Sequence, residues 1–327
     1  MSKLVTIYGG SGFLGRYIAQ RMAQAGWRVR VAVRRPNEAM FVKPYGAVGQ
    51  VEPVLCNIRD EASVAAAMSG ADAVVNCVGI LLEVGKNEFG PIQTEGAERI
   101  AQLAAAQGIG TLVHISSIGA DDQAESEYSK TKAAGEAGVL RHMPHAVILR
   151  PSVIFGPEDQ FFNKFAAISR FGPVLPVVGP KTRFQPVYVD DVAQAAAMGV
   201  LGLAKPGVYE LGGPDIATFR ELMQKLLQVI HRRRALPTMP HFMAWLMAAS
   251  LDLDEKLTFG LFKNVILTRD QLRSLMRDNV VSEGAQGFTD LGITPTSMDA
   301  VLPEYLWKFR PTGQYDEMTR SARKLNS

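Results

Sequence analysis

The sequence predicts an α/β fold, in which a doubly wound parallel sheet is followed by a smaller, mixed C-terminal region. Short apolar runs rich in valine and isoleucine alternate with helical patterns as far as Pro151, as expected for a parallel sheet with helices on both faces. A glycine-rich turn at 9–15 lies directly between the first of these runs and the first helical pattern. Beyond Pro151 the alternation stops and glycine and proline become frequent, which indicates a different architecture.

The individual strands and helices follow from these patterns. Strands are predicted at 3–8, 27–33, 51–56, 73–78, 111–115 and 146–151. Helices are predicted at 16–26, 62–68, 93–107 and 129–141. Later elements are a strand leading into a helix at 185–191, a strand at 208–213 and a helix at 218–230. Asp190 or Asp191 is placed to cap the first of these later helices.

The composition is that of a globular protein. The chain has 327 residues, of which 47% are hydrophobic and 20% are charged. We expect residues 1–151 to form a nucleotide-binding domain that also receives segments from 185–213, and residues 152–327 to form a smaller substrate- or partner-side region. The net charge of +3 is too small to indicate nucleic acid as a partner. The five histidines and two cysteines lack the spacing of a metal site, so no metal is predicted.

No targeting or membrane-spanning segment is recognisable in the sequence. The chain begins at its first core strand, without a basic-then-apolar signal peptide. No window contains the roughly 18 uninterrupted apolar residues that a membrane-spanning helix requires. We therefore expect a soluble or peripheral protein that stays in the cytoplasm.

The turn at 9–15 has the spacing of a dinucleotide-binding loop. Gly9 can adopt backbone angles that a side chain forbids, Gly12 lets the main chain approach a pyrophosphate, and Gly15 lets helix and strand pack closely. Unpaired amides at the helix start then face the phosphates with a favourable dipole. The residues that add to this phosphate site are Ser11, Phe13 and Leu14. The alternative, an ordinary glycine-rich turn, is weaker because a strand precedes the motif and a helix follows it, so we predict a Rossmann-type sheet.

Two arginines follow the second predicted strand, where proteins that prefer NAD place an acidic residue for the ribose 2′-hydroxyl. Arg34 and Arg35 occupy this position, and Arg16 follows the third glycine. A guanidinium group offers several donors and a permanent charge, which suits the additional phosphate of NADP(H). We therefore predict NADP(H) as the cofactor. The alternative is a solvated arginine pair without a ligand.

A second group of residues is predicted to reach the cofactor and a substrate. Tyr128 and Lys132 are four residues apart, so they lie on one helix face, where the ammonium group would lower the pKa of the phenol. Ser116 and Ser117 follow a predicted strand at the sheet edge where ligands bind, and the hydroxyl of one of them can donate to a substrate carbonyl; Ser117 is the candidate. Ser117, Tyr128 and Lys132 are the candidate catalytic residues, and both Tyr128 and Lys132 are also expected to contact the cofactor. Further cofactor contacts are predicted where other strands end, at Asn57, Val78, Gly79 and Pro151.

A basic and an apolar segment adjoin each other in the last third of the chain. His231–Arg234 is a basic cluster, and the run 240–251 that follows is apolar, rich in methionine and expected to be helical. We expect a basic-apolar helical stretch over 231–281. Such a combination suits a membrane surface or the groove of a hydrophobic partner, contacted through 231–251. A helix packed on its own domain beside a solvated arginine run is an equal alternative.

These motifs together resemble the extended or atypical short-chain dehydrogenase/reductase superfamily. The residues that carry the resemblance are the glycine turn, Asn76–Gly79, His114–Ser117, Tyr128–Lys132 with Gly135–Glu136, and Arg150–Ser152. Within the superfamily the chain is similar to one branch, the nucleotide-binding alpha-subcomplex subunit nine family of respiratory complex I and its bacterial relatives. The segments that carry this closer resemblance are 150–159, 161–165, 170–173 and 185–191.

The resemblance implies an NADPH-binding accessory or assembly subunit of respiratory complex I (NADH:ubiquinone oxidoreductase). Members of that branch hold NADPH as a structural ligand at the junction of the peripheral and membrane arms. The implied partners are other complex I subunits. The implied location is the cytoplasmic face of a bacterial inner membrane, because mitochondrial members carry a targeting peptide and this chain begins at a strand. The complete Ser/Tyr/Lys set leaves an alternative: an active NADP-dependent reductase or epimerase-like enzyme on a small carbonyl or hydroxyl compound, such as a quinone or lipid precursor.

Overall fold

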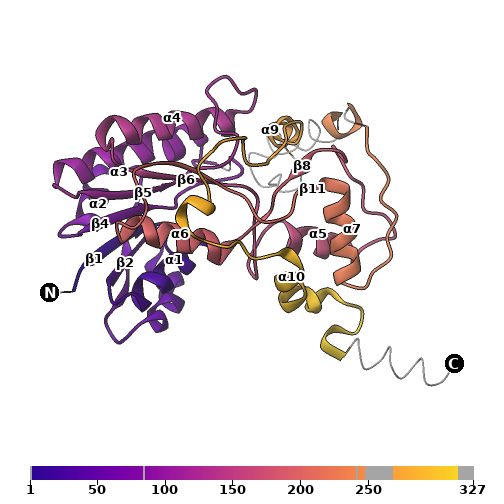
Figure 1. The fold of residues 1–327 in the computed structure, drawn as a ribbon, viewed down its shortest axis with the longest axis horizontal. Helices are drawn as coiled ribbons and strands as arrows, with labels where there is room; N and C mark the ends of the chain where they lie inside the picture. The colour runs from indigo at the N-terminus through magenta and orange to yellow at the C-terminus, as the bar shows by residue number, and fades with distance from the viewer. Residues whose placement is uncertain (1, 84, 241, 247–267, 316–327) are drawn as a thin grey trace.

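A parallel sheet of seven strands organises the larger lobe of the molecule (Figure 1). The computed structural model describes residues 2–83, 85–240, 242–246 and 268–315. The strands are β1 (Leu4–Tyr8), β2 (Arg28–Val33), β3 (Val51–Leu55), β4 (Ala73–Asn76), β5 (Thr111–Ile115), β6 (Val147–Pro151) and β10 (Gly207–Leu211). Their order across the sheet is β10-β6-β5-β4-β1-β2-β3. This order reverses next to β1, as in a doubly wound dinucleotide-binding sheet, and it confirms the predicted fold class.

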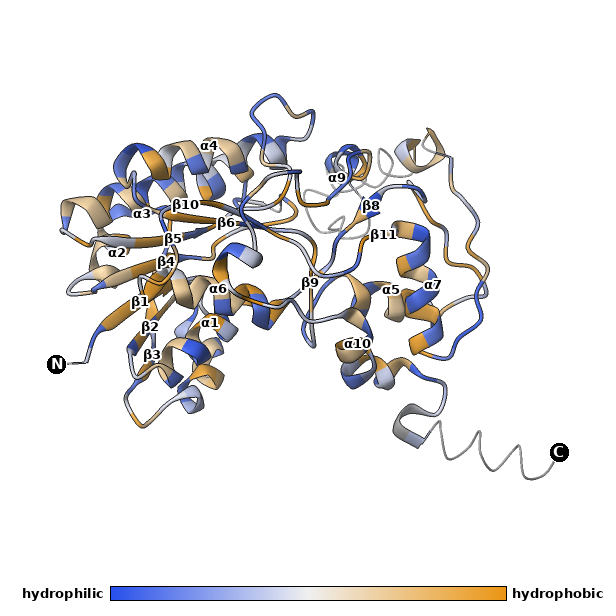
Figure 2. Cartoon of the chain, in the orientation of Figure 1, coloured by the Kyte–Doolittle hydropathy of each residue, from blue (hydrophilic) through white to orange (hydrophobic). Residues whose placement is uncertain are grey.

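Helices cover both faces of this sheet. They are α1 (Phe13–Gln24) and α6 (Val189–Val200) on one face, and α2 (Glu61–Met68), α3 (Glu95–Ala106) and α4 (Glu127–His142) on the other. Alternate residues of a strand enter alternate cores: Val5 and Ile7 of β1 pack with α1, and Tyr8 packs with α2 and α3. Because helices cover both faces, the central strands β1 and β4 are largely apolar, and Figure 2 shows them mostly in orange.

A smaller lobe lies beyond the carboxyl ends of the strands (Figure 1). Its helices are α5 (Phe162–Ile168), α7 (Phe219–Val229), α9 (Arg269–Ser274) and α10 (Met298–Leu306), and its short strand pairs are β7 (Ile154–Phe155) with β9 (Val187–Tyr188) and β8 (Arg183–Phe184) with β11 (Ala217–Thr218). The core of this lobe is aromatic, since the Phe161 ring lies 5.0 to 6.2 Å from four other phenylalanine rings. The exact division of the chain into two domains stays a prediction.

Shorter helical segments lie between or after these elements. They are η1 (Pro36–Tyr45), η2 (Gly90–Thr94), η3 (Thr289–Leu291), η4 (Trp307–Phe309) and η5 (Gly313–Tyr315). No helix in the described ranges is long and apolar enough to cross a membrane.

The aspartates expected to cap α6 have a different role. Both lie inside the first turn of the helix, and Tyr188 is the N-cap residue. Arg21 of α1 donates to Asp190 at 2.7 Å, and the amide of Thr296 donates to Asp191 at 2.6 Å. The two carboxylates therefore tie α6 to α1 and to the C-terminal segment instead of capping the helix.

The predicted helical stretch 231–281 is helical only in part. Residues 232–240 contain no helix, because Pro237 and Pro240 lack the amide donor that a helix interior needs. Residues 242–246 are helical, and α9 follows at 269–274. The remainder of the predicted helix at 240–251, from residue 247 on, lies outside the described residues.

Candidate functional site

The glycine turn adopts a tight conformation in which two positions favour or require glycine for steric reasons. Gly9 has a φ of +74°, a left-handed conformation that favours glycine, and its carbonyl accepts the Gly12 amide at 2.9 Å. A β-carbon on Gly15 would lie 2.7 Å from Cα of Gly10, so only glycine allows α1 to approach the turn this closely. Gly12 is exposed, which leaves the main chain accessible at this point.

The start of α1 offers backbone donors and a cation. Gly12 is the N-cap and has no side chain to accept from the first-turn amides, which include those of Phe13 and Leu14. Arg16 stays close to the turn, because its Nη2 donates to the carbonyl of Ser11 at 3.2 Å. Its guanidinium carbon also lies 4.8 Å from the centroid of the Phe41 ring. A helix N-terminus with a fixed cation beside it suits a diphosphate.

The other predicted cofactor residues lie where neighbouring parallel strands end, and therefore at the same edge of the sheet. They are Arg34 and Arg35 after β2, Asn57 after β3, Val78 and Gly79 after β4, and Pro151 at the end of β6. Arg34 donates to Asn87 Oδ1 at 3.0 Å, and Arg35 pairs with Glu38 at 3.0 Å. Both arginines are exposed, so either can exchange its present partner for a phosphate at little cost.

Tyr128 and Lys132 lie on α4, beside the ends of β4 and β5. Lys132 is only 5% exposed, and its Nζ donates to the carbonyl oxygen of Ile115 at 3.0 Å. A β-carbon on Gly79 would lie 3.3 Å from this Nζ, so the ammonium group also borders the end of β4. The Phe89 ring covers the Tyr128 ring edge-on at 5.9 Å. The structure thus brings together predicted residues from α4, β4 and β5.

Burial controls the ionisation of both side chains. Burial lowers the pKa of Lys132 to about 8, while Glu136 and Cys77 act in the opposite direction. Burial raises the pKa of Tyr128. The predicted lowering of the Tyr128 pKa by Lys132 is therefore wrong for this structure. Desolvation of the phenol dominates, and the ammonium group donates to the backbone instead.

Buried polar atoms gather beside Lys132. His114 is 2% exposed, and its Nδ1 lies 3.2 Å from the side-chain nitrogen Nδ2 of Asn76. Because this nitrogen can only donate, Nδ1 accepts and the ring proton is on Nε2. Among the described residues, this Nε2 and the hydroxyls of Ser116 and Ser117 have no hydrogen-bond partner. Burial lowers the pKa of His114 to about 3, so the imidazole stays neutral. Buried polar groups are normally paired, and this set fits a ligand rich in hydroxyl and amide groups, such as a dinucleotide.

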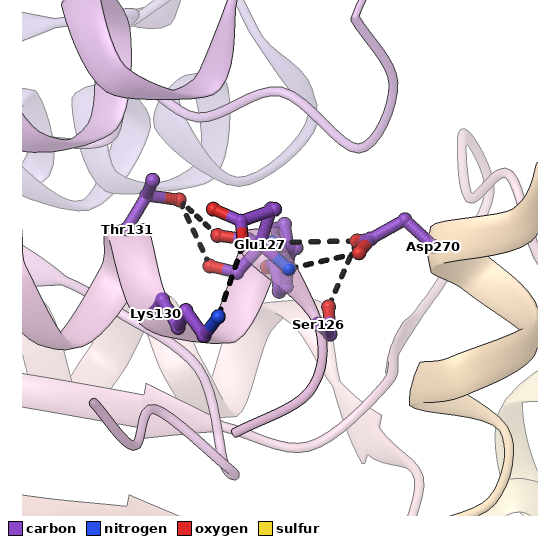
Figure 3. A network of polar contacts seen from close by, with 6 residues as sticks. Ser126, Glu127, Lys130, Thr131 and Asp270 are labelled. Carbon is purple, nitrogen blue, oxygen red and sulfur yellow. Dashed lines mark hydrogen bonds and ion pairs between the residues drawn. The ribbon is translucent and has the colours of Figure 1, made fainter. Parts of the chain in front are cut away.

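The start of α4 is held by a carboxylate from the smaller lobe (Figure 3). Asp270 of α9 accepts from Ser126 Oγ and from the Glu127 amide, both at 2.8 Å, and from the Tyr128 amide at 3.3 Å. Ser126 is the N-cap residue, but its side chain does not cap the helix, and Asp270 performs that role. Sequence analysis missed Asp270, because it lies 144 residues from Ser126 and no local motif marks it.

An ion-pair network holds the next part of α4 against the sheet. Arg150 of β6 donates to both carboxylate oxygens of Glu136, at 2.9 and 2.6 Å, and its Nη1 lies 3.6 Å from Glu210 of β10. The carboxylate side chains are 6% and 10% exposed. Because Glu136 lies one turn after Lys132, this network fixes the helix that presents Tyr128 and Lys132.

Lys132→Met is expected to stabilise the ligand-free protein by about 2 kcal/mol at pH 7. The folded pKa of Lys132 is about 8 and its ordinary value is 10.5, so the charge costs about 3 kcal/mol, of which the hydrogen bond to Ile115 returns about 1 kcal/mol. Because the folded pKa is the lower one, this cost is complete below pH 8 and disappears as pH rises toward 10.5. The stability gain should therefore shrink over that range.

Urea unfolding at pH 7 and at pH 10 measures this gain. Lys130→Met, on the exposed side of the same helix, is the matched control and should change stability little. A destabilised Lys132→Met variant would contradict the expectation that the buried ammonium group is kept at a cost for ligand binding.

Comparison with known proteins places this geometry in a family. The pattern of the NAD dependent epimerase/dehydratase family matches residues 5–212. The chain is 35% identical to NADH dehydrogenase (ubiquinone) 1 alpha subcomplex subunit 9, mitochondrial, of Arabidopsis thaliana, over 95% of this chain and 79% of that protein. It is 31% identical to the ceramide reductase of Caulobacter vibrioides, over 72% of this chain and 74% of that protein.

A solved structure shares the fold at lower identity. The NADPH-dependent quinone oxidoreductase QOR2 of Escherichia coli, complexed with NADPH, superposes with a TM-score of 0.68 at 17% identity, over 92% of this chain and 98% of that one. The fold, the sequence pattern and the similarity over 95% of this chain agree with the resemblance expected from the motifs. The chain therefore belongs to the NAD dependent epimerase/dehydratase family and, within it, to the branch of the complex I alpha subcomplex subunit 9 proteins.

Proposed function

We propose that the protein is an accessory or assembly subunit of respiratory complex I that holds NADPH as a structural ligand. The observation that carries this proposal is the similarity to a mitochondrial NADH dehydrogenase subunit over 95% of the chain. The same similarity supports other complex I subunits as partners, and the proposal includes the junction of the peripheral and membrane arms as the place of action. The location included in this proposal is the cytoplasmic face of a bacterial inner membrane.

The residues present can hold such a nucleotide. The start of α1 with Gly12 would bind the diphosphate, Arg34 the 2′-phosphate, and Lys132 the nicotinamide ribose. A ligand that binds only the folded protein stabilises it by mass action, by about 2.7 kcal/mol at 100 times its dissociation constant. NADPH would thereby offset the cost of burying the Lys132 ammonium group and the unpaired hydroxyls of Ser116 and Ser117.

Gentle solubilisation of native membranes tests the assignment to the complex. We expect the chain to migrate with complex I on a native gel and to retain NADPH when purified. Deletion of its gene should reduce the amount of assembled complex. Free migration of the chain, with assembly unaffected by its deletion, would contradict the proposal.

Arg34→Asp is expected to weaken NADPH binding by roughly 10- to 100-fold, because a hydrogen bond to a charged group contributes about 1.5–3 kcal/mol. Binding of NADH, which lacks the 2′-phosphate, should change little. Calorimetric titration with both nucleotides measures the difference, and Arg28→Asp, at the opposite end of β2, is the control. Equal losses for NADPH and NADH would assign Arg34 a role other than binding the 2′-phosphate.

A second candidate function is a NADP-dependent reductase or epimerase-like activity on a small carbonyl or hydroxyl compound. The observation that favours it is the unpartnered hydroxyl of Ser117 beside Tyr128, in a chain that is 31% identical to a ceramide reductase. In that function NADPH supplies the hydride, Ser117 orients the substrate carbonyl and Tyr128 holds the proton that is transferred. Tyr128→Phe distinguishes the two: it leaves assembly of complex I intact in the first function and abolishes NADPH oxidation in the second.

A further inference from the structure

Positive charge is concentrated in two segments that build much of the smaller lobe. Residues 160–189 and 222–246 contain eight lysines and arginines and no aspartate or glutamate. The whole chain has 35 basic and 32 acidic residues, so the remainder has an excess of acidic groups. The small net charge of the chain therefore conceals an excess of positive charge in these two segments, of which Arg183 and Lys225 pair with Asp278 and Asp299.

Parts of the two segments, 174–177 and 235–238, run side by side along the end of the smaller lobe that lies away from the sheet (Figure 1). Parallel bridges join Val174 to Ala235 and Val177 to Thr238. Arg234 Nε donates to the carbonyl of Ser169 at 2.8 Å, which fixes the arginine run beside the end of α5. The described residues of 168–178 and 231–246 form what we call the basic-apolar edge.

An open depression of about 610 Å³ lies between α7 and this edge. The polar residues that line it are Arg220, Arg232, Arg233, Arg234, Gln224 and Gln228. Backbone carbonyls hold three of the guanidinium groups in place, but in the described part of the chain no carboxylate forms an ion pair with any of the four arginines. Burial and the nearby charges of Arg234 and Arg170 lower the pKa of Arg232. Like charges held together without a counter-ion suit an anionic ligand.

Large apolar side chains are exposed along the same edge. They are Phe171, Val174, Phe242, Met243, Trp245 and Leu246. Phe171 is 91% exposed and directly follows Arg170, and Val174 is bridged to the residue after Arg234. Exposed apolar side chains that are grouped in this way mark a binding surface rather than ordinary surface.

We propose that the basic-apolar edge docks on the surface of an anionic phospholipid bilayer. The arginines of the depression bind lipid phosphates, and the exposed aromatic and aliphatic side chains enter the boundary between headgroups and acyl chains. This inference deepens the proposed function, since it names the membrane contact of a peripheral subunit. It also adds residues 168–178, which sequence analysis did not assign to a docking surface.

Charge and composition favour a lipid surface over other anionic partners. A nucleic acid would meet the acidic remainder of the chain as soon as it extended beyond the edge. A flat anionic surface would contact the end of the lobe that lies away from the sheet, where Phe171 and Val174 are exposed beside the arginine run. That mixture matches a bilayer, in which phosphate and hydrocarbon lie within a few ångströms of each other.

Vesicle binding by the purified full-length protein tests the proposal. Sedimentation with vesicles of phosphatidylcholine containing phosphatidylglycerol should retain the protein, whereas vesicles of phosphatidylcholine alone should not, and added salt should release it. The triple variant Arg232→Gln, Arg233→Gln, Arg234→Gln should bind roughly 100-fold more weakly, at roughly fivefold for each charge. The matched control removes three exposed charges of the larger lobe, with Arg28→Gln, Lys43→Gln and Lys205→Gln, and should bind like the wild type.

Tryptophan fluorescence tests the apolar part of the basic-apolar edge separately. Trp245 emission should shift to shorter wavelength on anionic vesicles, and this shift should be lost in Trp245→Phe, in which Trp27 and Trp307 remain. Phe171→Ser should weaken binding without changing its salt dependence. Equal binding of the triple variant and the control, or equal binding to neutral vesicles, would overturn the proposal. NADPH retention and migration with complex I are separate measurements, so loss of vesicle binding with both intact would refute this inference alone.

Discussion

Gly15→Ala is expected to destabilise the protein by about 1–3 kcal/mol and to weaken NADPH binding by roughly 100-fold. Alanine in place of glycine within a helix ordinarily stabilises by about 1 kcal/mol. Here the sign reverses, because the added methyl group would lie 2.7 Å from Cα of Gly10 and still closer to the carbonyl oxygen of Gly9. Both are backbone atoms, so the contact is relieved only when α1 moves away from the turn. That movement carries the first-turn amides away from the diphosphate.

Gly90→Ala is the matched control for this substitution. It lies in a helical turn, and a β-carbon there would meet no atom within 4 Å. We expect its stability and nucleotide affinity to equal or exceed those of the wild type. Urea unfolding of the ligand-free proteins and fluorescence titration with NADPH measure both quantities. Unchanged NADPH affinity in Gly15→Ala would show that the turn and α1 do not hold the nucleotide.

The sheet could be predicted from the sequence because its physical causes are local. Strands covered on both faces are rich in apolar residues, and every predicted strand of the larger lobe is present within two residues of its expected ends. The spacing of Gly9, Gly12 and Gly15 reflects one short turn, so it too can be read without knowing the rest of the chain. The predicted cofactor residues share one edge for a topological reason, since parallel strands end on the same side.

The support of the site could not be predicted, because it depends on partners far apart in the sequence. Asp270 caps α4 from the smaller lobe, and its neighbours in sequence carry no signal of that contact. The pKa of Tyr128 was predicted with the wrong sign, because helical spacing places Lys132 on the same face but says nothing about how deeply the phenol is buried. The basic-apolar edge was found only in part, since 168–178 joins 231–246 through tertiary pairing.

Arg150→Met is expected to destabilise the protein by about 3–5 kcal/mol, the largest effect of any substitution considered for this chain. The methionine fills a similar volume but leaves the carboxylates of Glu136 and Glu210 in a largely buried position without the guanidinium group that pairs with them. Glu136 loses two charge-assisted hydrogen bonds, of 2.9 and 2.6 Å, while Glu210 keeps the amide of Ser282 at 2.7 Å. The uncompensated charge therefore falls mainly on α4, the helix that carries Tyr128 and Lys132.

Urea unfolding of Arg150→Met, alone and combined with Glu136→Gln, measures this effect. The double variant should recover a large part of the lost stability, because it removes the carboxylate left unpaired, and the difference gives the coupling between the two side chains. Arg141→Met is the control, since Arg141 pairs with Glu98 on the exposed side of the same helix and should contribute less than about 1 kcal/mol. If Arg150→Met and Arg141→Met cost the same, the network does not anchor α4. If the double variant recovers stability but not NADPH binding, the bidentate pair itself positions α4 for the nucleotide.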